Sequence, residues 1–314
     1  GHAHPAHEAR VAAMAREIGF TQVTTSHDVG AVIRLVPRAN TAVVDAYLSP
    51  PLRDYVNTVA AGLPGVNLAF MQSNGGLARA GHFHGRDAIL SGPAGGIVGM
   101  AAAGRSAGED RLIGFDMGGT STDVSLFDGQ YERAEDVIIA GVPMRVPMLK
   151  IDTVAAGGGS IISHAGGRLK VGPESAGAVP GPAAYRRGGP LTITDANVML
   201  GIVQPDHFPA LFGPGGDQPL DADAVRTGFS RLGEAIAQPP EQVAAGARAI
   251  ATETMAQAIR RISIARGHDA ARYTLTSFGG AGGQHACAIA DQLGMTRILI
   301  HPLAGLLSAF GIGL

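Results

Sequence analysis

The chain has 314 residues and a formal net charge of −2, with 46% hydrophobic and 16% charged residues. This composition excludes general disorder and gives no electrostatic case for a nucleic-acid or anionic-membrane partner. A single cysteine excludes an intrachain disulfide framework and favours a reducing, cytoplasmic location. Glycine is unusually common, because the 46 glycines are about twice the usual share of ~7%.

The N-terminal part is predicted to be mainly helical. Residues 5–18 carry apolar side chains at helical spacing, and residues 41–61 favour a second helix that Pro50 and Pro51 disturb. The other elements expected here are short strands at 20–25 and 66–71 and a glycine-rich helix at 86–103. No segment reaches the ~20 apolar residues that a membrane span needs.

From residue 111 onward, apolar strands alternate with helices, which favours an α/β fold. Strands are expected at 112–115, 137–139, 144–151, 275–278 and 297–300, and one further strand is expected to include Val124. Helices are expected at 242–266 and 282–293. Between them, residues 153–192 are rich in glycine and proline and predict a long irregular region. A loop of ~40 residues is unusual unless it is functional.

A carboxylate and a glycine doublet follow the first of these strands. Asp116 precedes Gly118 and Gly119, and the next residues are Thr120, Ser121, Thr122 and Asp123. Adjacent glycines allow a tight turn whose N–H groups converge into an anion-binding nest, and the hydroxyls add donors. Asp116 beside the nest is placed to hold Mg²⁺ and its water shell against phosphate oxygens. The alternative is an ordinary hairpin turn with polar ends.

A second glycine cluster joins the strand at 275–278 to a helix. It comprises Gly279, Gly280, Ala281, Gly282, Gly283 and Gln284. A helix N-terminus offers unpaired N–H groups, and a backbone almost without side chains lets a purine or phosphate lie against it. His285 stands where a dinucleotide fingerprint needs glycine or alanine, and no Gly-Lys pair exists for a P-loop. Close strand–helix packing is the alternative.

A third cluster, Gly157, Gly158, Gly159 and Ser160, is compatible with another anion nest, a hinge or a plain loop. The first two clusters lie ~160 residues apart, one in a strand hairpin and one at a strand–helix junction. This arrangement fits the second half of an actin-like ATPase (ribonuclease H-like) fold, with a mixed sheet flanked by helices.

The chain also resembles the hydantoinase A/oxoprolinase family. The matching segments run in order along nearly the whole chain: MQSNGGL (71–77), LSGPAGG (90–96), GFDMGGTSTDV (114–124), VAAGGGS (154–160), VGPESAGAVPGPAAYRRGGP (171–190), TDANVMLG (194–201), RGHD (266–269) and FGGAGGQHACAIA (278–290). The run GGQHACA, with FGP at 212–214, QPL at 218–220 and His301-Pro302, favours the oxoprolinase branch over the N-methylhydantoinase branch.

The resemblance implies an enzyme that uses ATP and Mg²⁺ to activate a small cyclic amide by phosphorylating its carbonyl oxygen. A hydantoinase B-type subunit or region would complete ring opening. It implies that Asp116 and Asp123 are catalytic, with Asp116 as the metal ligand. The nucleotide-binding residues would be Gly118, Gly119, Thr120, Ser121, Thr122, Gly157, Gly158, Gly159, Ser160, Gly279, Gly280, Ala281, Gly282, Gly283 and Gln284. Glu174, Ser175 and Arg186 are the predicted substrate-binding residues.

The family also has an earlier Asp-Gly-Gly-Thr loop, whereas this chain has one such loop. We therefore expect a fragment that is inactive alone. Residues 1–108 would be the C-terminal part of the first ATPase half with a connecting helix, and residues 109–314 the second half. Two other functions stay open: an ATP-dependent ketone (acetone or acetophenone) carboxylase subunit and a non-catalytic actin-like nucleotide-binding module. The sequence also allows a homo-oligomer.

Overall fold

The computed structural model describes residues 3–30 and 33–314, and the chain folds into two compact units. Unit 1 comprises Gly1–Gly99, Tyr131–Lys150 and Ser308–Leu314, and unit 2 comprises Met100–Gln130 and Ile151–Leu307. The chain therefore leaves unit 1, returns to it for one hairpin, and ends in it. The assignment of 1–108 and 109–314 to two ATPase halves stays a prediction.

Unit 1 combines helices with two short antiparallel hairpins. Its elements are α1 (Pro5–Glu17), α2 (Ser26–Val29), α3 (Leu35–Gly62), β1 (Ala69–Met71) paired with β2 (Leu77–Arg79), the first half of α4 (Ser91–Ser106), β5 (Arg133–Ile139) paired with β6 (Val142–Leu149), and most of α9 (Leu307–Ile312). A small core forms where Met144, Val146 and Met148 of β6 pack against Val44 and Leu90.

Two predictions for unit 1 need correction. The strand expected at 20–25 is wrong: this segment has no strand partner and leads directly into α2. The second helix begins at Leu35 and continues through Pro50 and Pro51. Helices in proteins are stabilised largely by tertiary packing, and α3 buries Asp45, Ser49 and Val56 along one face, on both sides of the prolines.

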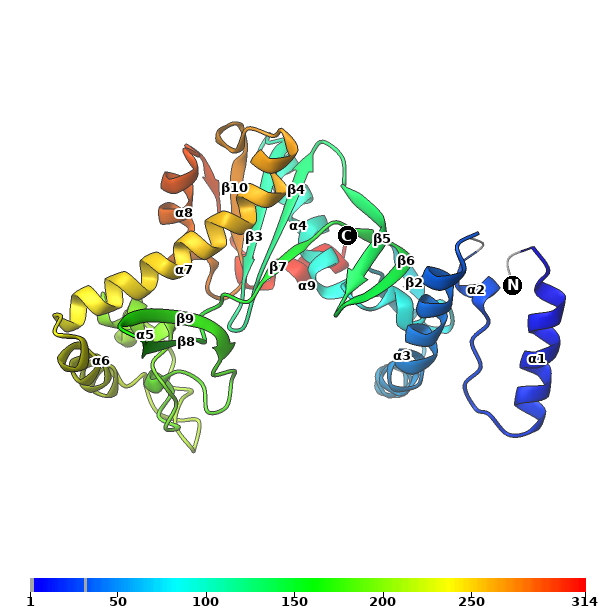
Figure 1. Cartoon of the computed structure of the whole chain (residues 1–314), viewed down its shortest axis with the longest axis horizontal. Coiled ribbons are helices and arrows are strands. Elements are labelled where there is room, and N and C mark those ends of the chain that lie inside the picture. Colours follow the sequence, from blue (N-terminus) through cyan, green and yellow to red (C-terminus); the bar gives the residue numbers. More distant parts are fainter. Residues whose placement is uncertain (1–2, 31–32) are drawn as a thin grey trace. The chain divides into compact units, whose positions relative to one another are not determined.

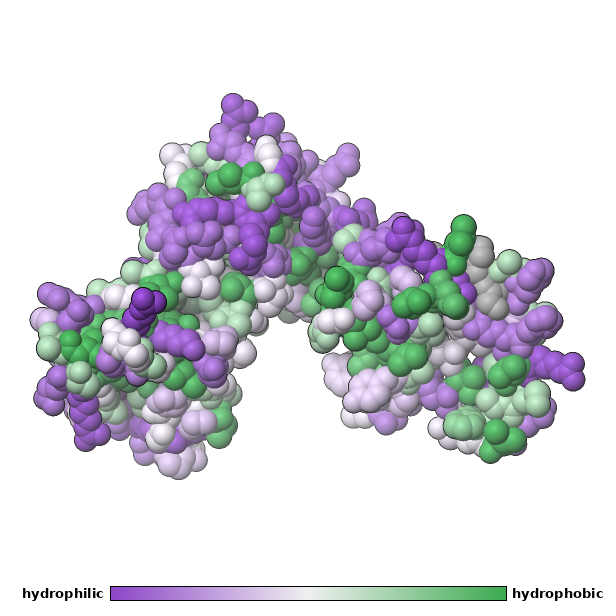
Figure 2. Space-filling model, viewed as in Figure 1, coloured by the Kyte–Doolittle hydropathy of each residue, from purple (hydrophilic) through white to green (hydrophobic). Residues whose placement is uncertain are grey.

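The surface of unit 1 keeps many large apolar side chains. Figure 2 shows green surface over the N-terminal elements. Val11 and Met14 lie on α1, Ile18 lies at its C-terminal end, and Val43 and Tyr47 lie on α3. Each of these side chains is more than half exposed. Contiguous apolar surface is a feature of protein interfaces.

Unit 2 is built on one mixed sheet of five strands in the order β11-β10-β3-β4-β7. The strands are β3 (Arg111–Met117), β4 (Thr122–Asp128), β7 (Asp152–Val154), β10 (Thr274–Phe278) and β11 (Ile298–Leu299). β11, β10 and β3 run parallel, whereas β4 is antiparallel to both β3 and β7. The predicted α/β class with a mixed sheet flanked by helices is thus present.

The remaining elements of unit 2 surround this sheet. They are the hairpin β8 (Ser160–Ala165) and β9 (Arg168–Ser175), and the helices α5 (Ile193–Met199), α6 (Ala222–Ile236), α7 (Pro240–Ile262) and α8 (Ala286–Leu293). The long α7 crosses the sheet and also packs on α5 and α6 (Figure 1). Its buried face, including Met255 and Ile259, belongs to the main hydrophobic core with Phe115 and Val124.

The two faces of the sheet carry different residues because side chains alternate along a strand. On the α7 face, the Thr122 hydroxyl contacts the sulfur of Met255. On the opposite face, Gly114 lies so close to Met100 of α4 that a Cβ would meet its sulfur at 2.7 Å. Asp116 is two residues from Gly114 along β3, so it lies on the same face as Gly114, the α4 face.

The region 153–192 is more regular than predicted. It contains β7, β8 and β9, and the β8–β9 turn uses Gly166 and Gly167 with φ of +57° and +76°. The helix expected at 282–293 is also divided: Gly282–Gln284 is a 3₁₀ turn and α8 begins at Ala286. Among the described residues, no helix is both long and apolar enough to cross a membrane.

Candidate functional site

The turn between β3 and β4 leaves three backbone donors without a protein acceptor. Within residues 3–30 and 33–314, the N–H groups of Gly119, Thr120 and Ser121 have no hydrogen-bond partner. Gly119 and Thr120 are exposed and Ser121 is partly exposed. Only the N–H of Gly118 is used, since it donates to the Ser121 carbonyl at 3.1 Å. A run of open N–H groups at a glycine turn is the arrangement of an anion nest.

Three consecutive carbonyl groups at the start of the same turn, those of Met117, Gly118 and Gly119, accept hydrogen bonds from neighbouring segments. Ala281 donates to the Met117 carbonyl at 2.9 Å, Gly158 donates to that of Gly118 at 3.1 Å, and Gly159 donates to that of Gly119 at 2.6 Å. The three glycine clusters predicted from the sequence therefore meet at one place in unit 2. Because the neighbouring segments hold the carbonyl side of the turn, its conformation is fixed while its donors stay open.

Two carboxylates lie beside this turn. Asp116 and Asp123 are register partners of β3 and β4, so they project from the same face of the sheet. Thr153 donates its hydroxyl to Asp123 at 2.5 Å. Burial raises the pKa of Asp123 above its ordinary value, and the hydrogen bond from Thr153 opposes that shift.

The 157–160 segment braces the turn from the side. Its four residues are buried, and their N–H groups all donate within the chain. A Cβ on Gly157 would lie 2.7 Å from the Gly119 carbonyl oxygen, and one on Gly159 would lie 2.9 Å from the same atom. Only glycine allows this approach. The geometry gives these residues a supporting role, and their predicted contact with a nucleotide stays a prediction.

The 279–284 segment approaches β3 equally closely. Gly279 has a φ of +78°, and a Cβ there would collide with the Asp116 carboxylate and the Met117 carbonyl. Gly280 and Gly283 are exposed, and no described residue accepts a hydrogen bond from their N–H groups. These two positions leave open backbone close to Asp116.

A buried polar cluster supports this segment from below, and sequence reasoning did not find it. Asn197 donates from Nδ2 to Gln284 Oε1 at 2.7 Å and to His285 Nε2 at 3.2 Å. Because Nε2 accepts, the proton of the neutral ring is assigned to Nδ1, which faces the Thr252 hydroxyl at 3.4 Å. Arg248 donates to the Gln284 carbonyl at 3.0 Å. The matching runs TDAN and GGQH were the signal, since each contributes one side of this cluster.

Burial lowers the pKa of His285 to about 4, and the charge of Arg248 acts in the same direction. The ring is therefore neutral at physiological pH and can serve as the acceptor that Asn197 needs. This cluster fixes both the side chain and the carbonyl of Gln284, where the glycine segment ends.

Other predicted site residues have structural partners. The Thr122 hydroxyl is buried and donates to the Ala156 carbonyl at 2.5 Å, so its predicted contact with phosphate stays a prediction. Arg186 donates to Asp221 at 2.8 Å and to the Pro219 carbonyl at 2.7 Å. Glu174 is exposed on β9, and Ser175 lies next to Gly159. Their predicted roles in substrate binding stay predictions.

The donor set beside the turn fits a hard cation bound in part by phosphate. In the described part of the chain, no group of three or more His, Cys, Asp or Glu side chains is placed to enclose a metal ion. Mg²⁺ is commonly held by one or two carboxylates together with waters and substrate phosphates, rather than by a complete protein cage. Asp116 and Asp123 supply two carboxylates next to open N–H groups, which is that kind of site.

The comparisons with known proteins identify the family. The hydantoinase/oxoprolinase family matches residues 38–314, and the chain belongs to this family. It is 48% identical to 5-oxoprolinase 1 of Arabidopsis thaliana over 99% of this chain and 26% of that protein. It is 37% identical to caprolactamase subunit alpha of Pseudomonas jessenii over 98% of this chain and 45% of that protein.

Two solved structures share the fold. The nucleotide-free structure of acetone carboxylase superimposes with a TM-score of 0.84 at 26% identity, over 99% of this chain and 45% of that one. The structure of the ATP-dependent caprolactamase from Pseudomonas jessenii superimposes with a TM-score of 0.81 at 35% identity, over 98% of this chain and 45% of that one. The chain spans about a quarter of the 5-oxoprolinase and less than half of the caprolactamase and acetone carboxylase chains that it matches.

Proposed function

We propose that the 118–121 turn binds the phosphates of ATP in an enzyme that hydrolyses a cyclic amide. The observation that carries this proposal is the division of the turn into two sides. The carbonyls of Met117, Gly118 and Gly119 are held by the 157–159 and 279–281 segments, whereas the N–H groups of Gly119, Thr120 and Ser121 have no acceptor among the described residues. Fixed donors beside a carboxylate pair suit an anionic ligand whose charge changes during reaction.

Each group has one role in this proposal. The N–H groups of Gly119, Thr120 and Ser121, together with the side-chain hydroxyls of Thr120 and Ser121, would donate to phosphate oxygens. Asp116 and Asp123 would hold Mg²⁺, which supplies positive charge against the phosphates when bound. Gly280 and Gly283 leave open backbone for the rest of the nucleotide. In phosphoryl transfer, positioning and charge stabilisation account for most of the catalysis, and these residues provide both.

The relatives point to lactams as the substrate class. Two of them are named for enzymes that act on 5-oxoproline and caprolactam, which are both cyclic amides. An amide carbonyl is a poor electrophile, and transfer of the γ-phosphoryl group to its oxygen would make the carbon reactive toward water. The products would be the ring-opened amino acid, ADP and phosphate. Because one relative is called a subunit alpha, we also propose a second, hydantoinase B-type subunit or region.

Ketone carboxylation is the second candidate, favoured by the acetone carboxylase superposition. Sequence identity is lower there, at 26%, than to the 5-oxoprolinase, at 48%. The test is ADP release by the full-length protein with 5-oxoproline, hydantoin, caprolactam, or acetone plus bicarbonate. With 5-oxoproline, we expect the protein to release ADP and to form an equal amount of the ring-opened product. Release with acetone and bicarbonate alone would replace the hydrolase by the carboxylase, and no release with any of them would leave a nucleotide-binding module.

A further inference from the structure

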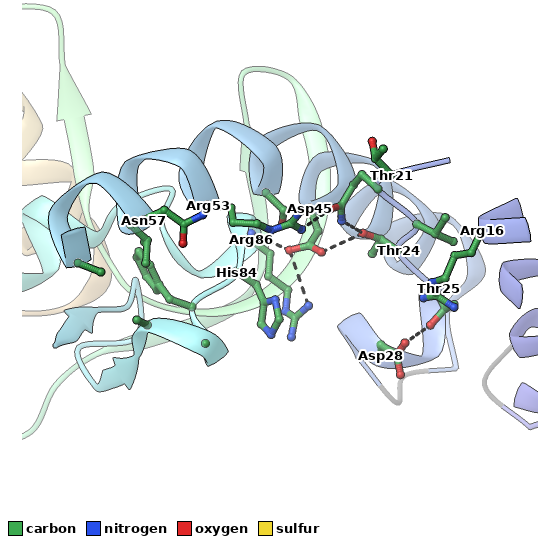
Figure 3. Close-up of a pocket in the computed structure, with 18 residues that line it drawn as sticks. Arg16, Thr21, Thr24, Thr25, Asp28, Asp45, Arg53, Asn57, His84 and Arg86 are labelled. Atoms are coloured by element: carbon green, nitrogen blue, oxygen red, sulfur yellow. Dashed lines mark hydrogen bonds and ion pairs between the residues drawn. The ribbon is translucent and has the colours of Figure 1, made fainter. Parts of the chain in front are cut away.

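A polar cavity of about 750 Å³ lies within unit 1, well inside the ~300–1,000 Å³ range of small-molecule sites. One wall is a face of α3 with Asp45, Ser49 and Arg53. The other walls are the end of α1, the 21–25 segment and the 80–86 segment. Figure 3 shows Asp45 joined to Thr24 and Arg86 by dashed lines.

The floor of the cavity is a buried hydrogen-bonded unit. Asp45 is 3% exposed, and it accepts from the Thr24 hydroxyl at 3.2 Å and the Arg86 N–H at 3.1 Å. Ser49 accepts from the Gly85 N–H at 3.1 Å. A Cβ on Gly85 would lie 2.7 Å from the Leu48 Cβ, so the 80–86 segment sits directly on α3. Side chains anchored in this way are held in place before a ligand arrives.

The walls carry more positive than negative charge. Arg86 is shared between Asp45 and Asp87, each 3.7 Å from its guanidinium. Arg53 donates to the neutral Gln22 amide oxygen at 2.6 Å, and it has no carboxylate partner among the described residues. Arg16 has no ion-pair partner there either. Arginine presents a planar fork that matches a carboxylate, and a bond to an ionised acceptor is roughly twice as strong as one to a neutral amide.

We propose that Arg53 and Arg86 bind the carboxylate of the amide substrate in this cavity. The proposal rests on the proposed function for the substrate class. Its basis in unit 1 is independent of the nucleotide turn: an arginine bound only to a neutral amide, beside a second arginine whose carboxylate partners are 3.7 Å away. A carboxylate would replace Gln22 on Arg53.

The pair of arginines would also determine specificity. 5-Oxoproline carries a carboxylate on its ring, whereas caprolactam and 2-pyrrolidinone do not. A site that contributes charge-assisted hydrogen bonds to the carboxylate discriminates strongly against an analogue without it. We therefore expect the full-length protein to prefer 5-oxoproline over 2-pyrrolidinone through KM rather than kcat.

The test compares Arg53→Gln and Arg86→Gln with Arg10→Gln in the full-length protein. Arg10 is an exposed arginine of α1 that does not line the cavity, so it controls for loss of charge. Calorimetric titration with 5-oxoproline, without ATP, reports binding alone. We expect each cavity variant to bind ~10–100-fold more weakly, in line with the loss of a charged hydrogen bond, and Arg10→Gln to bind as wild type. Titration with 2-pyrrolidinone should give the same weak affinity for all four proteins.

Wild-type binding of 5-oxoproline by both cavity variants, or no binding by the wild-type protein, overturns the proposal. If Arg86→Gln fails to fold, the exposed Arg53→Gln decides alone. An Asp116→Asn variant separates this proposal from the proposed function. This variant should lose ATP cleavage and keep 5-oxoproline binding. A wild-type protein that binds 5-oxoproline through Arg53 but does not cleave ATP would refute the hydrolase and leave the binding proposal standing.

Discussion

Asp116 and Asp123 face each other across neighbouring antiparallel strands, on the side of the sheet opposite α7. Directly opposed residues of such strands have Cβ atoms ~4.5–5.5 Å apart, so two ionised carboxylates there repel each other unless a cation lies between them. This arrangement is the reason for proposing the pair as ligands of Mg²⁺.

The first prediction concerns these two carboxylates. In the full-length protein, Asp116→Asn should lower ATP turnover by ~100-fold or more, because it removes fixed charge beside the reacting phosphate. Asp123→Asn should raise the Mg²⁺ concentration that gives half-maximal turnover. Asp128→Asn is the matched control, since Asp128 is an exposed residue at the far end of the same strand. Titration of ADP release with Mg²⁺ measures all three, and wild-type turnover in Asp116→Asn would remove Asp116 from the site.

The second prediction concerns the support of the turn. Gly157→Ala places a methyl group 2.7 Å from the Gly119 carbonyl oxygen and 2.8 Å from the Thr120 carbonyl carbon, both backbone atoms that cannot rotate away. Overpacking of this kind costs about 1–3 kcal/mol of stability. We expect a lower melting temperature and a higher KM for ATP. In Gly92→Ala, where a Cβ meets open space at the start of α4, both should stay unchanged. An unchanged KM in Gly157→Ala would show that the turn does not need this brace.

Much of the site was predictable because glycine clusters carry their own physical signal. The doublet Gly118-Gly119 after a buried strand predicted a turn with open N–H groups, and the structure has one there. The meeting of the three clusters was not predictable from spacing. It depends on β10 pairing with β3 and on the hydrogen bonds from Gly158 to Gly118 and from Gly159 to Gly119, which join residues far apart in the sequence.

The errors have physical causes as well. The β8–β9 hairpin was missed because exposed residues in both strands weaken the alternation, although Gly166-Gly167 is a recognised hairpin turn sequence. The strand expected at 20–25 has the right residues and no partner strand. In the sequence, His285 served only to exclude a dinucleotide fingerprint, and its structural role depends on Asn197 and Thr252, which only the fold brings to it.

The third prediction concerns the pH dependence of stability. His285 has a pKa of about 4 in the folded chain, against 6.5 for an unperturbed histidine. Between these values the unfolded state binds a proton that the folded state excludes. Stability is therefore fully present above pH 6.5 and is lost as the pH falls toward 4, by on the order of 3 kcal/mol. Protonation would also remove the acceptor that Asn197 uses, and so release Gln284.

Urea unfolding of the wild-type chain and of His285→Gln, followed by circular dichroism at pH 7 and pH 4.5, measures this contribution. We expect the wild-type chain to lose more stability than the variant between the two pH values. His164→Gln, a change at an exposed histidine of β8, should behave as wild type. Equal losses in the wild-type chain and in His285→Gln would mean that His285 accepts a proton in the folded state, and the tautomer assigned from Asn197 would then be wrong.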